Sequence, residues 1–236
     1  MFAAADGAVI QWGVALDQKE EAVTSCQAVA SLLMLTGNID NPGGMIKPPE
    51  VLMYLNGWGF DLISQEQYAK RLGPDKYKFY NAGVVAASAE CMIEAMETGE
   101  PYPLKAAWIQ TNNPLTCMGV DPKRTLEAFK KLEFIVVVDP FKTPTIMALA
   151  DVVLPVAMFP ERNGIRCGDG AQRIETINKA IDDPSLKSDM EINLELGRRL
   201  NPEAWPWDNV EDMFSAVYDS VGMTFEEAQR QAPGYV

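Results

Sequence analysis

The stretch FIVVVDPFKTPT, residues 134–145, decides the fold. Its first five residues form a continuous apolar run rich in β-branched side chains, which is typical of a strand buried on both faces of a sheet. AAWIQT (106–111) is a second strand candidate upstream, and DVVLPV (151–156) is a third downstream. The pattern therefore predicts a sheet built from three consecutive apolar segments.

Helical segments fill the gaps between these strands. Asp121 is a good N-cap residue and Pro122 a good first-turn residue, so a helix is expected from there through Lys131. A short helix is expected after Thr143. Strands that alternate with helices at this spacing predict a parallel, Rossmann-like α/β sheet flanked by helices, with its core over residues 104–200.

The flanking segments are more varied. A helix is expected over Glu21–Leu35, ended by Gly37, and Ser88 could cap a helix that runs to Met96. Residues 46–85 carry scattered Gly and Pro and predict an irregular excursion. We expect residues 1–236 to form a single α/β domain.

A helical tail is expected over residues 201–236 of this domain, after a helix that ends at Leu200. Ser188–Glu191 has the pattern of a capping box that opens this last helix of the core. Asp208–Glu211 and Thr224–Glu227 repeat this type of signal and predict two more helices in the tail.

Composition excludes several classes of function. A formal net charge of −13 argues against nucleic-acid binding, and the absence of histidine removes the commonest general base and metal ligand. The four cysteines form no CxxC pair, so buried reduced thiols are favoured, although a disulfide stays open. No apolar run is long enough for direct membrane insertion. The N-terminal stretch has no targeting signal, which leaves cytoplasmic and periplasmic locations open.

Polar residues follow each predicted strand, where parallel α/β sheets bind ligands. QTNNPLTCMG (110–119) offers small side chains and two asparagines that can both donate and accept hydrogen bonds. Asp139 follows the second strand, where dinucleotide-binding folds place a ribose-binding carboxylate, and Thr143 and Lys142 are close by. PVAMFPERNG (155–164) follows the third strand.

Structural alternatives stay open at each of these positions. The Asn-Asn-Pro segment could be only a turn, and Asp139 and Asp151 could be turn residues that flank strands. A loose basic run could be a solvated face or a site for anionic groups; its members are Arg162, Arg166, Arg173 and Lys179. Neither GxGxxG nor GxxxxGK[ST] is present, so the usual NAD and ATP fingerprints are missing.

Four motifs occur in an order that resembles one enzyme family. They are LLMLTGNIDNPGG (32–44), WIQTNNP (108–114), VVVDPFKTPT (136–145) and ALADVVLPVAMFPERNG (148–164). In this order they resemble the catalytic subunits of the molybdopterin oxidoreductases, the dimethyl sulfoxide reductase family. The resemblance covers roughly residues 9–200.

The resemblance implies a domain that cradles one of two molybdopterin guanine dinucleotides around molybdenum or tungsten. It assigns cofactor contacts to the loop Thr111, Asn112, Asn113 and Pro114, guanosine recognition to Asp139 and Thr143, and further approaches to the cofactor to Gly43, Gly44, Gln11 and Gly13. The family usually has Gly where Thr111 or Asn112 stands, so side chains could narrow that loop. IRCGDGAQR (165–173) also departs from the family pattern, and no pterin contact is assigned there.

The resemblance also implies what lies outside this chain. The metal ligand and an iron–sulfur cluster are expected elsewhere in a longer subunit, and Cys117 is disfavoured as a metal thiolate because its loop belongs to the nucleotide end. Expected partners are the remaining domains of that subunit and an iron–sulfur electron-transfer subunit. The leading hypothesis is a cofactor-binding fragment, inactive alone, of an enzyme used in anaerobic respiration. A non-catalytic structural relative within a redox complex is the alternative, and a free-standing nucleotide-binding protein is the weakest hypothesis.

Overall fold

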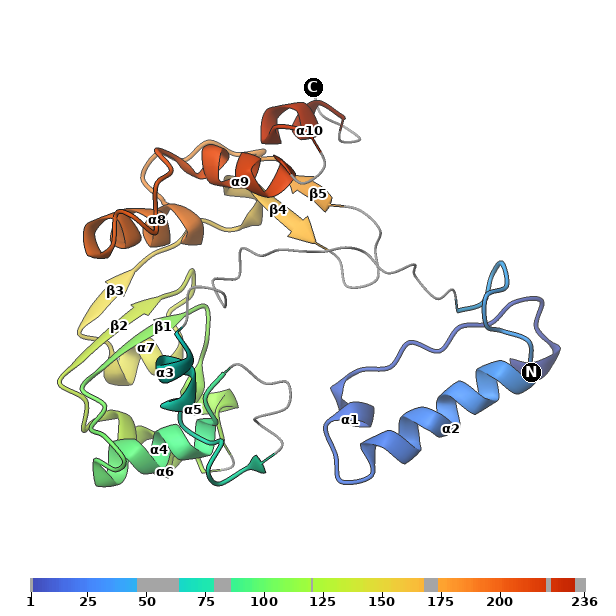
Figure 1. The fold of residues 1–236 in the computed structure, drawn as a ribbon, viewed down its shortest axis with the longest axis horizontal. Helices are drawn as coiled ribbons and strands as arrows, with labels where there is room; N and C mark the ends of the chain where they lie inside the picture. Colours follow the sequence, from blue (N-terminus) through green and yellow to red (C-terminus); the bar gives the residue numbers. More distant parts are fainter. Residues whose placement is uncertain are drawn as a thin grey trace. The chain divides into compact units, whose positions relative to one another are not determined.

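The computed structural model describes residues 2–45, 64–78, 86–119, 121–167, 174–219 and 222–231. The chain divides into two units. The first, here called the N-terminal unit, comprises Met1–Met53 with Cys167–Ile174, and the second, called the α/β unit, comprises Tyr54–Arg166 with Glu175–Val236. Figure 1 shows their secondary structure, and each unit is described by itself.

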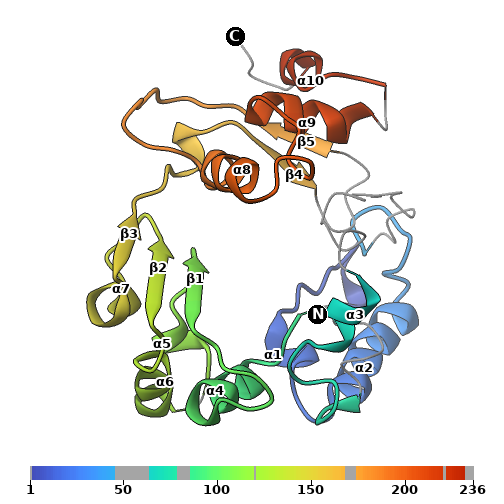
Figure 2. The same ribbon diagram turned by 60° about the vertical axis from the view of Figure 1, so that its left-hand side comes forward.

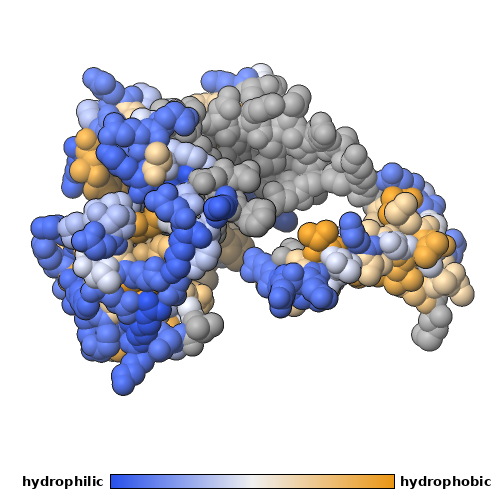
Figure 3. Space-filling model, turned by 60° about the horizontal axis from the view of Figure 1, so that its bottom comes forward, coloured by the Kyte–Doolittle hydropathy of each residue, from blue (hydrophilic) through white to orange (hydrophobic). Residues whose placement is uncertain are grey.

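The N-terminal unit is built around one helix. The helix predicted over Glu21–Leu35 forms as α2 (Ala22–Leu35), preceded by η1 (Phe2–Ala4) and α1 (Val14–Asp17). Gly37 follows it in the left-handed region at φ 69°, as expected for a residue that ends a helix. Helix α2 contains no charged residue, and Figure 3 shows hydrophobic residues gathered on the surface of this unit.

The α/β unit contains the predicted parallel sheet. Strands β1 (Ala106–Gln110), β2 (Phe134–Val138) and β3 (Val152–Leu154) pair in the order β1-β2-β3, side by side in Figure 2. Strand β2 lies in the middle, and both Val137 and Val138 are 0% exposed. The predicted α/β class with a parallel sheet is therefore confirmed.

Helices cover one face of this sheet. They are α4 (Ala89–Thr98), α5 (Pro114–Cys117), α6 (Pro122–Phe129) and α7 (Pro144–Leu149). Because alternate residues of a strand share a face, Ile109, Ile135 and Val137 point to the same side, where they form a core with Phe129 and Ile146. Both crossover helices, α6 and α7, thus contribute to one face.

An ion-pair cluster fastens α6 to α4. The guanidinium of Arg124 donates to Glu90 Oε1 at 2.6 Å and to Glu97 Oε2 at 2.7 Å. The hydrogen bond from Arg124 lowers the pKa of Glu97 and raises the pKa of Arg124 itself. The two acids are spaced so that both lie on the face of α4 that meets α6.

The C-terminal helices form the rest of the α/β unit. They are α8 (Asp189–Leu200), α9 (Val210–Tyr218) and α10 (Phe225–Gln231). Gln110 Nε2 donates to Asp189 Oδ1 at 2.8 Å and thereby connects β1 with the start of α8. Phe225 is only 1% exposed and lies 5.0 Å, between ring centroids, from Phe214 of α9.

Several details differ from expectation. Asn209, not Asp208, caps α9, because its side chain accepts from the Asp212 amide. The stretch after Asn163 forms strands β4 (Gly164–Cys167) and β5 (Ile174–Ile177), preceded by η5 (Phe159–Glu161). Within the predicted irregular excursion, α3 (Gln65–Ala69) forms with a capping box at Ser64, while residues 46–63 and 79–85 lie outside the described residues.

Other predicted boundaries agree closely with the structure. Ser188 and Glu191 form the predicted capping box of α8, and Thr224 and Glu227 exchange the hydrogen bonds of another at α10. Among the helices that the structure describes, none combines the length and apolarity needed to cross a membrane. The division into a core over 104–200 and a tail over 201–236 stays a prediction.

Candidate functional site

The carboxyl ends of β1 and β2 bring two predicted loops to one edge of the sheet. Thr111 N donates to Val138 O at 2.8 Å, and Asp139 N donates to Leu154 O at 3.2 Å. These bonds continue the parallel ladder one residue past each strand. The loop 111–114 and the loop 139–143 are therefore neighbours, as the topology predicted.

Thr111 adopts a backbone conformation that is uncommon for its residue type. Its φ is 46°, in the left-handed region, and the residue is exposed. A β-branched residue is a clear outlier there, because its Cβ approaches the following carbonyl group. Such a conformation persists only where the surrounding structure holds it, and it recurs at functional sites.

Asn113 is connected to the neighbouring loop by a buried hydroxyl group. Its Oδ1 accepts a hydrogen bond from Thr145 Oγ1 at 2.6 Å, and the same hydroxyl oxygen accepts from Leu115 N at 3.4 Å. Thr145 is 0% exposed, whereas Asn113 is partly exposed and occupies the N-cap position of α5. The loop after β1 is thus fastened to α7.

Asn112 and Cys117 form a small exposed cluster beside this connection. The thiol of Cys117 donates to Asn112 Oδ1 at 3.2 Å and to the Asn113 carbonyl at 3.0 Å. Pro114 is buried at the first position of α5. In the part of the chain that the structure describes, no group of three or more Cys, Asp or Glu residues could hold a metal ion.

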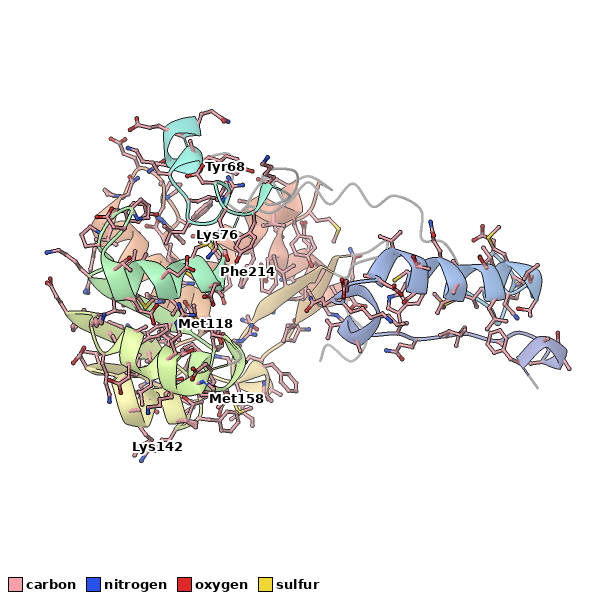
Figure 4. All side chains as sticks on the ribbon, turned by 90° about the horizontal axis from the view of Figure 1, so that it is seen from below. Tyr68, Lys76, Met118, Lys142, Met158 and Phe214 are labelled. Atoms are coloured by element: carbon pink, nitrogen blue, oxygen red, sulfur yellow. The ribbon has the colours of Figure 1, made fainter. Side chains whose placement is uncertain are left out.

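Asp139 and Thr143 lie in the second loop. Asp139 is 8% exposed, and its Oδ1 accepts from Phe141 N at 2.8 Å. Thr143 Oγ1 accepts from Ile146 N at 3.3 Å and so caps α7. Lys142 is exposed, and Figure 4 shows its side chain extending away from the helices.

Gly43 and Gly44 occupy positions that disfavour a side chain, Gly43 because of its backbone conformation and Gly44 because of lack of space. Gly43 has a φ of 83°, and a Cβ on Gly44 would lie 2.7 Å from the carbonyl oxygen of Asn38. Asn38 is 2% exposed; its Oδ1 accepts from Ala8 N at 2.8 Å, and its carbonyl accepts from Met45 N at 2.8 Å. The glycines therefore have a structural role in the N-terminal unit, whatever they contact.

Gln11 and Gly13 lie in the same unit. Gln11 lines an open depression of about 330 Å³ with Val9, Ile10, Trp12 and Met45. Gly13 precedes α1, and a Cβ there would meet nothing within 4 Å. The N-terminal unit thus brings the predicted residue Gln11 close to Met45, the neighbour of Gly44.

Polar residues that follow the third strand form hydrogen bonds and ion pairs with other parts of the protein. Asn163 Oδ1 accepts from Lys179 N at 3.0 Å, and its Nδ2 donates to Glu211 Oε1 at 3.0 Å. Lys179 pairs with Asp182 at 2.7 Å, and this hydrogen bond raises its pKa. Arg166 lies 3.7 Å from Glu175, so these two members of the basic run have acidic neighbours; Arg173 lies outside the described residues.

Two residues that organise the loops were not identified from the sequence. The sequence favours Thr143 as the polar residue of this segment, whereas the structure buries Thr145 in the first turn of α7. Asn38 lies within the motif LLMLTGNIDNPGG, which by itself assigns no role to this residue. In both cases the signal would have been a polar residue that must be buried and therefore needs hydrogen-bond partners.

A family model described as molybdopterin oxidoreductase matches residues 2–199. The chain therefore belongs to the molybdopterin oxidoreductase family, and the resemblance carried by the four ordered motifs is confirmed.

Individual relatives are similar over nearly the whole chain. Dopamine dehydroxylase of Eggerthella lenta is 31% identical over 207 residues, covering 84% of this chain and 20% of that protein. F420-dependent formate dehydrogenase 1 subunit alpha of Methanococcus maripaludis is 28% identical over 249 residues, covering 96% and 35%. The solved structure of acetylene hydratase from Pelobacter acetylenicus has the same fold, with a TM-score of 0.79 and 24% identity over 98% of this chain and 35% of that one. The chain spans between 20% and 35% of the length of these relatives.

Proposed function

We propose that this chain holds the guanine-dinucleotide part of a molybdopterin cofactor at the carboxyl edge of β1 and β2. The observation that carries the proposal is Asp139, a nearly buried carboxylate placed directly after the central strand and beside the loop 111–114. Membership of the family supports a molybdopterin-type cofactor with molybdenum or tungsten. The guanine dinucleotide form, and the residues that contact it, are the proposal.

The carboxylate of Asp139 suits a guanine base. An ionised carboxylate accepts up to about four hydrogen bonds, and the Phe141 amide uses one site on Oδ1. The second oxygen can accept from a ligand. Guanine presents adjacent N–H groups on N1 and N2, whereas adenine presents an acceptor at N1, so the carboxylate favours guanine.

The neighbouring loop suits the sugar and phosphates. Asn112 and Asn113 carry small amide side chains that can donate to phosphate or ribose oxygens, and both are at least partly exposed. Neither the loop 111–114 nor Asp139 contains a basic residue, and the chain as a whole carries a net charge of −13. Amide and backbone N–H donors would therefore supply most of the contacts to the anionic ligand.

The bound cofactor would supply the redox or hydration chemistry at its metal, and this chain would bind and orient it. The metal ligand and any iron–sulfur cluster would lie in other parts of the protein. Gly43, Gly44, Gln11 and Gly13 stay predicted contacts near the pterin. Partners would be the remaining domains of the subunit and an iron–sulfur electron-transfer subunit; one relative is itself named as a subunit alpha.

The test compares GDP with ADP as probes of the full chain prepared without cofactor. We expect GDP to bind more tightly than ADP, and Asp139→Asn to weaken GDP binding about tenfold or more, because it exchanges an acceptor for a donor. Asp139→Asn retains an acceptor for the Phe141 amide, so the loop should keep its conformation.

Asp151→Asn is the matched control. Asp151 accepts from Ile135 N at 2.7 Å, at the start of β2 and thus at the opposite edge of the sheet. This variant should bind GDP as the unmodified chain does. Equal binding of GDP and ADP, or equal loss in both variants, would contradict the proposal. Absence of molybdenum and tungsten from the intact protein would support a structural relative instead.

A further inference from the structure

We propose that Thr145 is a positioning residue that holds the Asn113 side-chain amide in one orientation, leaving its Nδ2 group to donate to the phosphate or ribose oxygens of the ligand. This inference rests on the proposed function and deepens it, since it assigns a direction to one contact. Thr145 itself touches no ligand in this account.

The hydroxyl of Thr145 both donates and accepts a hydrogen bond within the protein. A threonine hydroxyl has one proton to donate and two lone pairs to accept with. The proton goes to Asn113 Oδ1 at 2.6 Å, and one lone pair accepts from Leu115 N at 3.4 Å. Because Thr145 is 0% exposed, water cannot replace either partner, and the two bonds hold the loop in one arrangement.

The orientation of Asn113 follows from this bond. An amide that accepts at Oδ1 must place its two N–H donors on the other side of the group. Within the residues that the structure describes, no acceptor for Nδ2 of Asn113 is recorded, and the residue is partly exposed. Asn113 therefore offers a donor pair, which selects ligand groups that accept hydrogen bonds.

Thr143 and Thr145 have different roles despite their proximity. Thr143 Oγ1 accepts from Ile146 N, a local capping bond within α7. The bond from Thr145 Oγ1 joins two residues 32 positions apart, Asn113 in the loop after β1 and Thr145 in the first turn of α7. Loss of the first hydroxyl affects the start of one helix, whereas loss of the second frees the side chain that faces the ligand.

Three variants separate positioning from simple stability. Thr145→Val keeps the shape of the side chain and removes the donor, and Thr145→Ser keeps the hydroxyl. Asn113→Asp keeps an oxygen acceptor for Thr145 but replaces the N–H donors with a second negatively charged oxygen. Each would be measured in the full chain prepared without cofactor, by GDP titration and by hydrogen exchange of the peptide that contains Leu115.

We expect Thr145→Val to weaken GDP binding about tenfold and to speed hydrogen exchange of the Leu115 amide. Thr145→Ser keeps the hydroxyl and should show neither effect. Asn113→Asp should weaken GDP binding at least as much while exchange stays slow. The positioning role would be overturned if hydrogen exchange of the Leu115 amide were unchanged in Thr145→Val, or if it were as fast in Thr145→Ser as in Thr145→Val. Fast exchange in Thr145→Val, with no GDP binding by the unmodified chain, would instead count against the proposed function alone.

Discussion

Replacement of Thr111 by glycine should stabilise the protein. Thr111 has a φ of 46°, and within the described residues its side chain makes no recorded hydrogen bond, so glycine loses no contact that the structure shows. The backbone bond from Thr111 N to Val138 O at 2.8 Å is retained in any variant other than proline. The expected gain comes only from relief of the left-handed conformation.

The magnitude is a difference of two opposing effects. A residue with a Cβ pays about 1–2 kcal/mol in the left-handed region. Glycine raises the conformational entropy of the unfolded chain, which costs about 0.5–1 kcal/mol. The free energy of unfolding should therefore rise by up to about 1.5 kcal/mol, which for a chain of this size corresponds to at most roughly 6 °C in Tm.

Urea denaturation of Thr111→Gly, Thr111→Asn and Thr111→Ala would measure this effect. Asparagine tolerates the left-handed region better than alanine, so stability should decrease in the order Gly, Asn, Ala, Thr. Thr116→Gly is the control, because Thr116 lies in helix α5 and its hydroxyl donates to the Asn113 carbonyl at 3.1 Å; loss of this bond together with the lower helix propensity of glycine should destabilise by about 1 kcal/mol. If Thr111→Gly lowers stability as much as Thr116→Gly does, the strain argument is wrong.

Three further predictions concern the framework around the loops. Asn38→Ala should lower the free energy of unfolding by about 1–3 kcal/mol, measured by denaturation, because it leaves the partly buried amide of Ala8 without its partner; a change below about 0.5 kcal/mol would argue against this role. Gly197→Ala should destabilise by about 1–3 kcal/mol, because the new Cβ would lie 2.3 Å from the ring of Trp205, and a Tm equal to that of the unmodified protein would show that the ring moves freely. The hydrogen bond from Arg124 lowers the pKa of Glu97 from its ordinary value of 4.5. The stability that ionised Glu97 contributes is therefore fully present above pH 4.5, and it is lost as pH falls through the lower pKa of this carboxyl in the folded protein. The stability difference between the unmodified protein and Glu97→Gln should therefore be constant down to about pH 5 and shrink below it, and a difference that grows in acid would contradict this sign.

The sheet could be predicted from the sequence because its signals are local. The run Phe134–Val138 is apolar on both faces, and it is the central strand. The caps Asp121 and Ser188 satisfy backbone donors within three residues of themselves, so their motifs are readable without a structure. These signals lie within one short segment each, so the sequence alone is enough to predict them.

The missed features depend on partners distant in sequence. Thr145 and Asn113 are 32 residues apart, and the sequence around either residue contains no pattern that predicts their hydrogen bond. Strands β4 and β5 contain Gly164 and charged residues and gain their stability only as a pair. The sequence favours Asp208 as the cap of α9, whereas Asn209 caps it in the structure. Aspartate and asparagine have similar capping strength, so propensity alone does not distinguish between these adjacent residues.

The position of both crossover helices on one face of the sheet has a consequence for synthesis. Residues up to about Leu154 complete the three strands and the side covered by α6 and α7. The other side gains its bond from Gln110 to Asp189 only 79 residues after the glutamine. At roughly 5–20 residues per second, the ribosome needs about 2–7 seconds to extend the chain from Leu154, where the sheet is complete, to that partner. During this interval the nascent sheet has one finished side and one open side, where Trp108 and Phe134 are still 40% and 46% exposed in the folded chain. These two aromatic residues therefore form part of the apolar surface that the open side of the nascent sheet presents to a chaperone.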